Sequence, residues 1–309
     1  MTRHAISRPD LFLLLTALVW GSNYSVIKFV LQELPARTFN GLRLLVASAV
    51  FLAFIYGTSR REHVRRLTPR DWGIVVLLGV IGQFAYQIFF IEGLARTSVM
   101  NGSIIIACTP AAVSVVTALL GHERLPLTHW LGTALSFLGV TLIVLGGASS
   151  GTGSLLGDAM MIVSLACWTV YTVAGRPLLA RYPPLVITGL SMAIGAVLFL
   201  PFALGDFART PWTGVHPVAW VCVVFSSLLA LNFAYTAWYQ GVRQLGAPRT
   251  SIYANLVPVA ALLVAMVWLG ERLAGMRLLG ALLVACGVVL TRWRRRARPD
   301  DVVDVPAET

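Results

Sequence analysis

Long apolar stretches recur along this chain and constrain its fold more than any other feature. A helix that crosses a bilayer needs about 20 mainly apolar residues. We expect ten such helices, near residues 11–31, 37–56, 72–93, 98–120, 127–149, 155–174, 185–204, 217–241, 247–269 and 275–292. Because backbone groups in lipid must find their hydrogen bonds within the protein, the pattern predicts an all-α integral membrane protein.

The composition agrees with a membrane protein and excludes a soluble one. Hydrophobic residues make up 57% of the chain and charged residues 12%, whereas soluble proteins have roughly 45–50% and 25%. So few charges cannot solvate the surface of a soluble fold. The four cysteines lie singly inside apolar stretches, so they predict neither a zinc site nor a redox pair, and we expect no cofactor.

The net charge of +11 could suggest a nucleic-acid partner, but the basic residues are not distributed for one. If the N-terminus is cytoplasmic, seventeen arginines fall in cytoplasmic segments and five on the opposite side. This bias fits the positive-inside rule with both termini in the cytoplasm. We therefore expect a multi-pass protein of a bacterial inner membrane that binds no nucleic acid. The oligomeric state stays open, and a monomer is compatible with the sequence.

A constant shift of 148 residues relates the two halves of the chain. The identities that share this shift are Trp20 with Trp168, Pro35 with Pro183, Gly41 with Gly189, Gly93 with Gly241, Pro110 with Pro258, Gly132 with Gly280 and Gly139 with Gly287. The chain is therefore read as a duplication. It predicts a tail over 1–10, a first repeat over 11–149, a linker over 150–154, a second repeat over 155–293 and a tail over 294–309.

The number of spans in each repeat determines how the two copies are inserted. Each copy carries five, which is an odd number, so the second copy must enter the membrane from the opposite side. Inverted repeats around an axis in the membrane plane are the architecture of many secondary transporters. Because two such halves can exchange conformations, the sequence predicts a transporter that works by alternating access.

Several short motifs resemble those of the EamA-type permeases of the drug/metabolite transporter superfamily. They are the Trp20–Tyr24 run, Arg43 in the second span, and the Gly-Glu-Arg-Leu-like ends of the fourth and ninth spans, the first of which carries an inserted His122. The resemblance covers about residues 10–293, and the branch it suggests is the YddG-like amino-acid exporters. It implies a ten-helix exporter of amino acids, with aromatic ones as candidates, and no enzymatic activity.

Two alternative functions remain open on the sequence. An exporter of another small metabolite or drug, such as a nucleobase, a nucleoside or a cationic drug exchanged for protons, would have the same fold. The small multidrug-resistance relatives rely on a glutamate in their first span, whereas this chain carries Asn23 and Lys28 there. An intramembrane enzyme is a remote alternative, because there is no HExxH motif and the histidines fall in predicted loops or interfaces.

Polar and aromatic side chains form stripes on several of the predicted helices. Amide and phenol groups that faced lipid would be costly, so we expect the stripes to line a central cavity for a small amphipathic solute. The alternative is that these side chains only tie helices together. The predicted substrate-binding residues are Trp20, Asn23, Tyr24, Gln83, Tyr86, Gln87, Trp168, Tyr171, Asn232, Tyr235, Tyr239, Tyr253 and Asn255.

Two further groups of residues are candidates for roles in conformational change. Pro110 and Pro258 occupy equivalent positions near the middles of two spans, where a proline removes a helix hydrogen bond. They predict either paired hinges or static kinks. Four charged residues share the outer third of their spans and predict a gate network, unless they only anchor the spans by snorkelling. These four are Lys28, Arg43, Glu92 and Asp158.

Overall fold

The computed structural model describes residues 8–97, 102, 105–121, 125–145, 154–260, 264 and 275–292. Within these ranges every regular element is a helix, and helical residues occupy each of the ten predicted spans. Six helices are long and apolar enough to cross a membrane, and two shorter apolar helices span Ile105–Leu119 and Leu278–Thr291. The predicted all-α membrane fold is confirmed.

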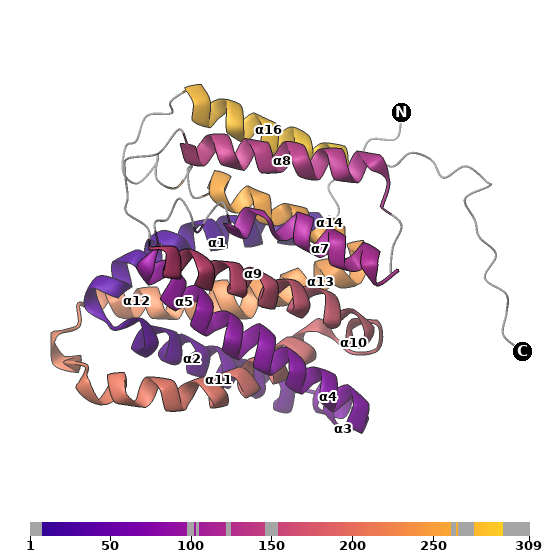
Figure 1. The fold of residues 1–309 in the computed structure, drawn as a ribbon. Coiled ribbons are helices and arrows are strands. Elements are labelled where there is room, and N and C mark those ends of the chain that lie inside the picture. Colours follow the sequence, from indigo (N-terminus) through magenta and orange to yellow (C-terminus); the bar gives the residue numbers. More distant parts are fainter. Residues whose placement is uncertain are drawn as a thin grey trace, which may run out of the picture.

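The described helices form one bundle in which the long ones run side by side (Figure 1). The first half contains α1 (Arg8–Glu33), α2 (Ala36–Tyr56), α3 (Arg61–Arg65), α4 (Pro69–Leu77), η1 (Leu78–Ala85), α5 (Tyr86–Arg96), α7 (Thr109–Leu119) and α8 (Leu127–Leu145). The second half contains α9 (Leu155–Ala174), α10 (Arg176–Arg181), α11 (Pro184–Arg209), η2 (Trp212–Gly214), α12 (Pro217–Phe225), η3 (Ser226–Phe233), α13 (Ala234–Leu245), α14 (Ala247–Ser251), η4 (Ile252–Asn255) and α16 (Gly275–Arg292).

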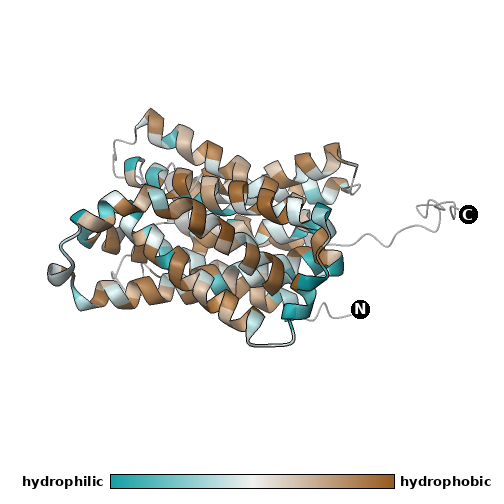
Figure 2. Ribbon diagram, turned by 90° about the horizontal axis from the view of Figure 1, so that it is seen from below, coloured by the Kyte–Doolittle hydropathy of each residue, from teal (hydrophilic) through white to brown (hydrophobic). Residues whose placement is uncertain are grey.

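Hydropathy divides this bundle into an apolar body and two polar ends. Hydrophobic residues predominate along the helices and hydrophilic ones gather at the ends (Figure 2). Large apolar side chains such as Leu155 and Val197 are mostly exposed, as expected for surfaces that face lipid. We call the end where α1 begins, α2 ends and α4 begins the N-terminal face, and the other end the opposite face.

The two halves share an unusual backbone feature. Helices η1 and η3 are π-helical, and each continues into an α-helix at both of its ends. Residues 78–85 of η1 become residues 226–233 of η3 under the 148-residue shift. Since π-helical segments are rare and often mark functional sites, their match indicates that the halves correspond in conformation as well as in sequence.

Residues related by the shift contact each other at three places in the bundle. The first pair has ring centroids 5.5 Å apart, and the other two pairs form hydrogen bonds of 3.1 and 3.4 Å. The pairs are Trp20 with Trp168, Gln87 with Tyr235, and Ser136 with Val284. Equivalent residues can meet only next to the axis that relates them, so the bundle is built around a pseudo-two-fold axis that passes between these pairs.

Helices α8 and α16 lie side by side at one edge of the bundle (Figure 1). A Cβ atom built on Gly139 would lie 2.5 Å from the carbonyl oxygen of Gly280, and one on Gly132 would lie 2.7 Å from that of Gly287. The glycines therefore allow the two backbones to approach closely. This use of the small residues joins the two halves within one chain.

Each of the two mid-span prolines lies next to a change in helical geometry. Helix α7 begins at Thr109, so Pro110 occupies its first turn, and Pro258 lies near the start of the helical residues that follow η4. A proline in a first turn lacks only an N–H group that has no helical partner. Each span therefore departs from regular α-helical geometry just before its proline, in keeping with a kink there. A hinge at these positions stays a prediction.

The first testable prediction concerns the close contact of α8 with α16 at Gly132, Gly139, Gly280 and Gly287, which we call the glycine seam. Gly139→Val should lower the free energy of unfolding by about 1–3 kcal/mol, because its methyl groups would meet backbone atoms that cannot move aside. Thermal unfolding in detergent measures the change. Gly205→Val is the matched control, since a Cβ there meets no atom within 4 Å. Equal melting temperatures for the two variants would refute the close approach.

Candidate functional site

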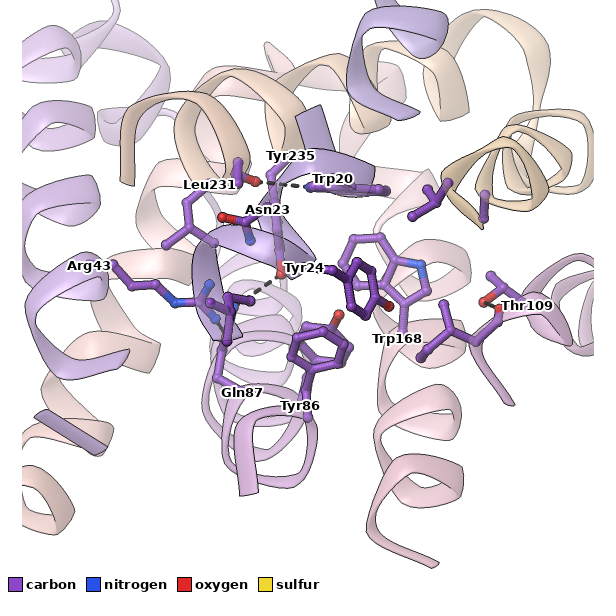
Figure 3. Close-up of a pocket in the computed structure, with 16 residues that line it drawn as sticks. Trp20, Asn23, Tyr24, Arg43, Tyr86, Gln87, Thr109, Trp168, Leu231 and Tyr235 are labelled. Atoms are coloured by element: carbon purple, nitrogen blue, oxygen red, sulfur yellow. Dashed lines mark hydrogen bonds between the residues drawn. The ribbon is translucent and has the colours of Figure 1, made fainter. Parts of the chain in front are cut away.

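A cavity lies in the middle of the bundle, enclosed by helices from both halves (Figure 3). Its volume is about 60 Å³, which is enough for a few water molecules at roughly 10–15 Å³ each. The lining residues are Trp20, Asn23, Tyr24, Ile27, Arg43, Tyr86, Gln87, Phe90, Ile106, Thr109, Trp168, Ala230, Leu231, Tyr235, Ala254 and Val257. A whole metabolite would need these side chains to move apart.

The structure brings about half of the predicted binding residues to this cavity. Those that line it are Trp20, Asn23, Tyr24, Tyr86, Gln87, Trp168 and Tyr235. Those that do not line it are Gln83, Tyr171, Asn232, Tyr239, Tyr253 and Asn255. Phe90, which continues the helical stripe of Gln83, Tyr86 and Gln87, also lines the cavity.

Three of the residues outside the lining tie helices together. Tyr239 donates a hydrogen bond to the Tyr171 carbonyl (2.8 Å), and Asn232 donates to the Ala47 carbonyl (3.0 Å). The Tyr253 hydroxyl donates to the carboxylate of Asp10 (2.6 Å). These contacts match the alternative in which buried polar groups connect neighbouring helices. For these positions the sequence could not distinguish a binding role from a structural one.

Trp168 occupies the centre of the aromatic wall. Five rings lie within 5.5 Å of it, measured between centroids, and two of them meet it nearly edge-on. The five rings belong to Trp20, Tyr86, Tyr171, Tyr235 and Trp238. Such contacts add about 0.5–1.5 kcal/mol per pair to the gain from burial. The wall therefore joins rings of both halves into one rigid unit.

One buried cation reaches the cavity. Arg43 is 2% exposed, and its guanidinium lies 5.2 Å from the centre of the Phe39 ring. It donates hydrogen bonds to Asn40 Oδ1 (2.7 Å), Gln87 Oε1 (2.7 Å) and Ser226 Oγ (3.3 Å). All three acceptors are neutral. Within the described part of the chain no carboxylate lies within ion-pair distance of Arg43.

This charge is costly, because a buried ion normally needs a counter-ion. Gln87 extends the Arg43 network by donating to the Tyr235 hydroxyl (3.1 Å), so the cation is linked to the pseudo-two-fold axis. The partner Asn40, three residues before Arg43 on α2, could have been found from helical spacing. Ser226 could not, because it comes from the other half of the chain.

An unpaired acceptor accompanies the cation. Asn23 is 7% exposed, and its Oδ1 atom has no hydrogen-bond partner among the described residues. Asn23 lines the cavity together with Arg43 and the rings of Tyr24 and Tyr86 (Figure 3). The cavity thus offers a guanidinium, an amide oxygen and aromatic surfaces. Such a set can bind a small solute that carries an anionic group, a hydrogen-bond donor and an apolar part.

Two of the four charged residues predicted as a gate, Arg43 and Glu92, have separate partners. Arg43 points into the cavity, whereas Glu92 binds Arg37 (2.8 Å) and Arg96 near the opposite face. Similar depth in the membrane placed them together in the prediction. Depth does not determine which neighbour a side chain meets, so Arg43 and Glu92 do not contact each other. A gate that involves the other charges stays a prediction.

Of the remaining members of the predicted gate, the structure describes the side chain of Asp158. Asp158, in the first turn of α9, accepts a hydrogen bond from the hydroxyl of Thr97. The side chain of Lys28 lies outside the described residues. The contact between Thr97 and Asp158 joins the first half to the second at the opposite face.

A second link between the halves lies at the N-terminal face and was not predicted. Asp71, which is 1% exposed, accepts hydrogen bonds from Arg181 (2.5 and 3.2 Å) and from the hydroxyl of Tyr182 (2.8 Å). Burial raises the pKa of Tyr182, and the bond to Asp71 raises it further. Asp71 also forms a capping box with Thr68 at the start of α4. The spacing of Thr68 and Asp71 in the sequence is typical of a capping box. The sequence does not show that Arg181 of α10 binds Asp71.

Comparisons with known proteins give consistent results. The profile of the EamA-like transporter family matches residues 7–145 and again residues 155–293. An uncharacterised transporter of Archaeoglobus fulgidus is 30% identical over 92% of this chain and 97% of its own length. A probable terminal-alkyne amino-acid exporter of Streptantibioticus cattleyicolor is also 30% identical, over 95% of this chain and 96% of its own.

A more distant relative and a solved structure extend these matches. A probable amino-acid metabolite efflux pump of Salmonella typhimurium is 25% identical over 95% of this chain and 99% of its own. A protein crystal structure aligns with a TM-score of 0.75 at 20% identity, covering 91% of this chain and 95% of the other. At that identity the structure supports the fold alone.

The central position of Trp168 generates the second prediction. Trp168→Ala should lower the free energy of unfolding by about 3–5 kcal/mol, because it leaves a cavity where five rings meet. Trp220→Ala is the control, since Trp220 is 40% exposed and lies on the apolar surface. Thermal unfolding in detergent compares the two. If both variants melt at the same temperature, Trp168 does not hold the halves together.

Proposed function

Because this chain belongs to the EamA-like transporter family, we propose that it is a secondary transporter that exports amino acids by alternating access. Two relatives support the substrate class by their names, which are a probable terminal-alkyne amino-acid exporter and a probable amino-acid metabolite efflux pump. The observation that carries the proposal is the buried guanidinium of Arg43, which lines the cavity beside neutral groups.

A carboxylate of the solute would supply the counter-ion that Arg43 lacks. Arginine binds carboxylates through parallel hydrogen bonds, which are stronger than bonds between neutral groups. The attraction is greatest in a dry, low-dielectric cavity such as one enclosed by aromatic rings. Solute binding therefore offsets the cost of keeping the guanidinium buried.

The other lining groups suit the rest of an amino acid. The free Oδ1 of Asn23 can accept a hydrogen bond from an ammonium group. The rings of Trp20, Tyr24 and Tyr86 provide surfaces for an apolar or aromatic side chain. A cationic drug fits this lining less well, because it would meet Arg43 without a carboxylate among the described lining residues.

Movement of the two halves would open the cavity to either side. The contact of Asp71 with Arg181 links the halves at the N-terminal face, and that of Thr97 with Asp158 links them at the opposite face. Each must break when the solute passes its end of the bundle. From the distribution of arginines we assign the N-terminal face to the cytoplasm and the protein to a bacterial inner membrane.

Transport of amino acids by an Arg43 variant tests the proposal. Arg43→Gln in proteoliposomes should reduce the initial rate of amino-acid uptake by roughly 10- to 100-fold, since a charged hydrogen bond is worth about 1.5–3 kcal/mol. Arg37→Gln is the matched control, because Arg37 is half exposed and binds Glu92 outside the cavity lining. It should transport at a rate close to that of the wild type.

Solutes that lack one group sharpen this test. Wild-type protein should discriminate against the amide of an amino acid, which has no carboxylate, and Arg43→Gln should lose that discrimination. Nucleosides and cationic dyes are tested in the same assay, because they represent the alternative substrate classes. Unchanged amino-acid uptake by Arg43→Gln, or uptake of dyes in preference to amino acids, would contradict the assigned substrate class.

The orientation generates a separate prediction. In a variant without the four native cysteines, Thr213→Cys beyond α11 should react with a membrane-impermeant thiol reagent in intact cells. Ser59→Cys beyond α2 should react only after permeabilisation, because the two exposed positions lie at opposite ends of the bundle. Labelling of both positions from one side would show that the assigned topology is wrong.

A further inference from the structure

The cavity has a counterpart that the 148-residue shift identifies. The shift takes Arg43 to Ser191 and Asn23 to Tyr171, and it takes the lining residue Leu231 back to Gln83. Asn40, the partner of Arg43, corresponds to Thr188. These four residues form a second polar cluster, which we define as Gln83, Tyr171, Thr188 and Ser191.

The members of the second polar cluster lie together between η1, α9 and α11. The hydroxyl of Tyr171 faces the side chains of the other three. A Cβ atom on Gly195 of α11 would lie 2.3 Å from the Cβ of Gln83, and one on Gly82 would lie 2.1 Å from the Tyr171 ring. Glycine at these two positions therefore lets the three helices close tightly over the cluster.

The second polar cluster is buried, and among the described residues most of its polar side-chain atoms lack a well-formed hydrogen bond. All four side chains are 0% exposed. Among the described residues, both polar atoms of the Gln83 amide, the Tyr171 hydroxyl and the Thr188 hydroxyl lie near other polar groups without forming a hydrogen bond of good geometry. Unpaired buried polar groups are costly and call for an explanation. They are explained if another conformation of the protein exposes these groups to water or to the solute, which then become their hydrogen-bond partners.

The cluster and the cavity cation lie at opposite depths. Arg43 lies seven residues after Ala36, where α2 starts at the opposite face, and Ser191 lies seven residues after Pro184, where α11 starts at the N-terminal face. The rings of Tyr171 and Tyr239 stack at 4.5 Å beside the cluster. When inverted halves exchange conformations, the region around Arg43 closes and its counterpart around Ser191 opens.

We infer that the second polar cluster lines the solute path in the alternate conformation, as a neutral subsite on the cytoplasmic side. This inference rests on the proposed transport by alternating access. Its oxygens, on Gln83, Tyr171 and Thr188, accept hydrogen bonds from donors such as the ammonium of an amino acid. The path is therefore chemically asymmetric, with a guanidinium towards one face and an amide with hydroxyls towards the other.

Accessibility of a cysteine tests the inference without any solute. In the cysteine-free variant, Ser191→Cys should react with a cationic methanethiosulfonate reagent applied from the cytoplasmic side. Adding Asp71→Asn, which weakens the contact with Arg181, should raise the rate by about tenfold if opening exposes the site. Ser114→Cys is the matched control, because Ser114 is equally buried and lies seven residues before Gly121 at the same face.

Two labelling results would overturn the inference. One is the absence of reaction at Ser191→Cys from both sides, with and without Asp71→Asn. The other is reaction from the opposite side alone. Because these outcomes need no transported substrate, they stay informative even if the chain moves something other than an amino acid.

Transport by Thr188→Val separates a solute contact from a structural role. This variant removes a hydroxyl that forms no hydrogen bond of good geometry and keeps the shape of the side chain, so the closed conformation should melt at the same or a higher temperature. The half-saturating concentration of amino acid should rise about tenfold from the cytoplasmic side, as for a lost hydrogen bond, and stay unchanged from the other. A lower melting temperature with equal loss from both sides would assign Thr188 a purely structural role and refute the subsite.

Discussion

The burial of the Arg43 guanidinium is the interaction on which the central region depends. A cation taken out of water must be compensated, and here neutral side chains from both halves of the chain do part of that work. Gln87 passes the network on to Tyr235 at the pseudo-two-fold axis. The position of the charge therefore explains why polar groups collect here in a bundle that is otherwise apolar.

The two halves are alike in backbone and different in chemistry. They share the π-helical segments, the glycine seam and the contacts across the axis. One half places an arginine where the other places Ser191. Under the proposed alternating access, similar backbones would give two conformations of comparable energy, and the different side chains would let the two ends of the path bind different parts of one solute.

Much of the fold could be predicted from local patterns, and less of the site could. Span length and the 148-residue shift were sufficient for the helices and their repeat. Helical stripes found Trp20, Tyr86 and Trp168 in the cavity, because a polar or aromatic side chain in a membrane avoids lipid. The same rule could not separate these from Tyr239, since a residue that faces inward can either line a cavity or bind a neighbouring helix.

The sequence by itself determined the membrane environment, the helical class and the duplication, because apolar length and repeated identities are properties of neighbouring residues. Tertiary structure alone decided that Arg43 belongs to the cavity and that Glu92 forms an ion pair with Arg37 outside its lining. It also decided that Asp71 meets Arg181. Such pairings join residues far apart in the chain, and their energies depend on distances and burial that exist only once the helices have packed.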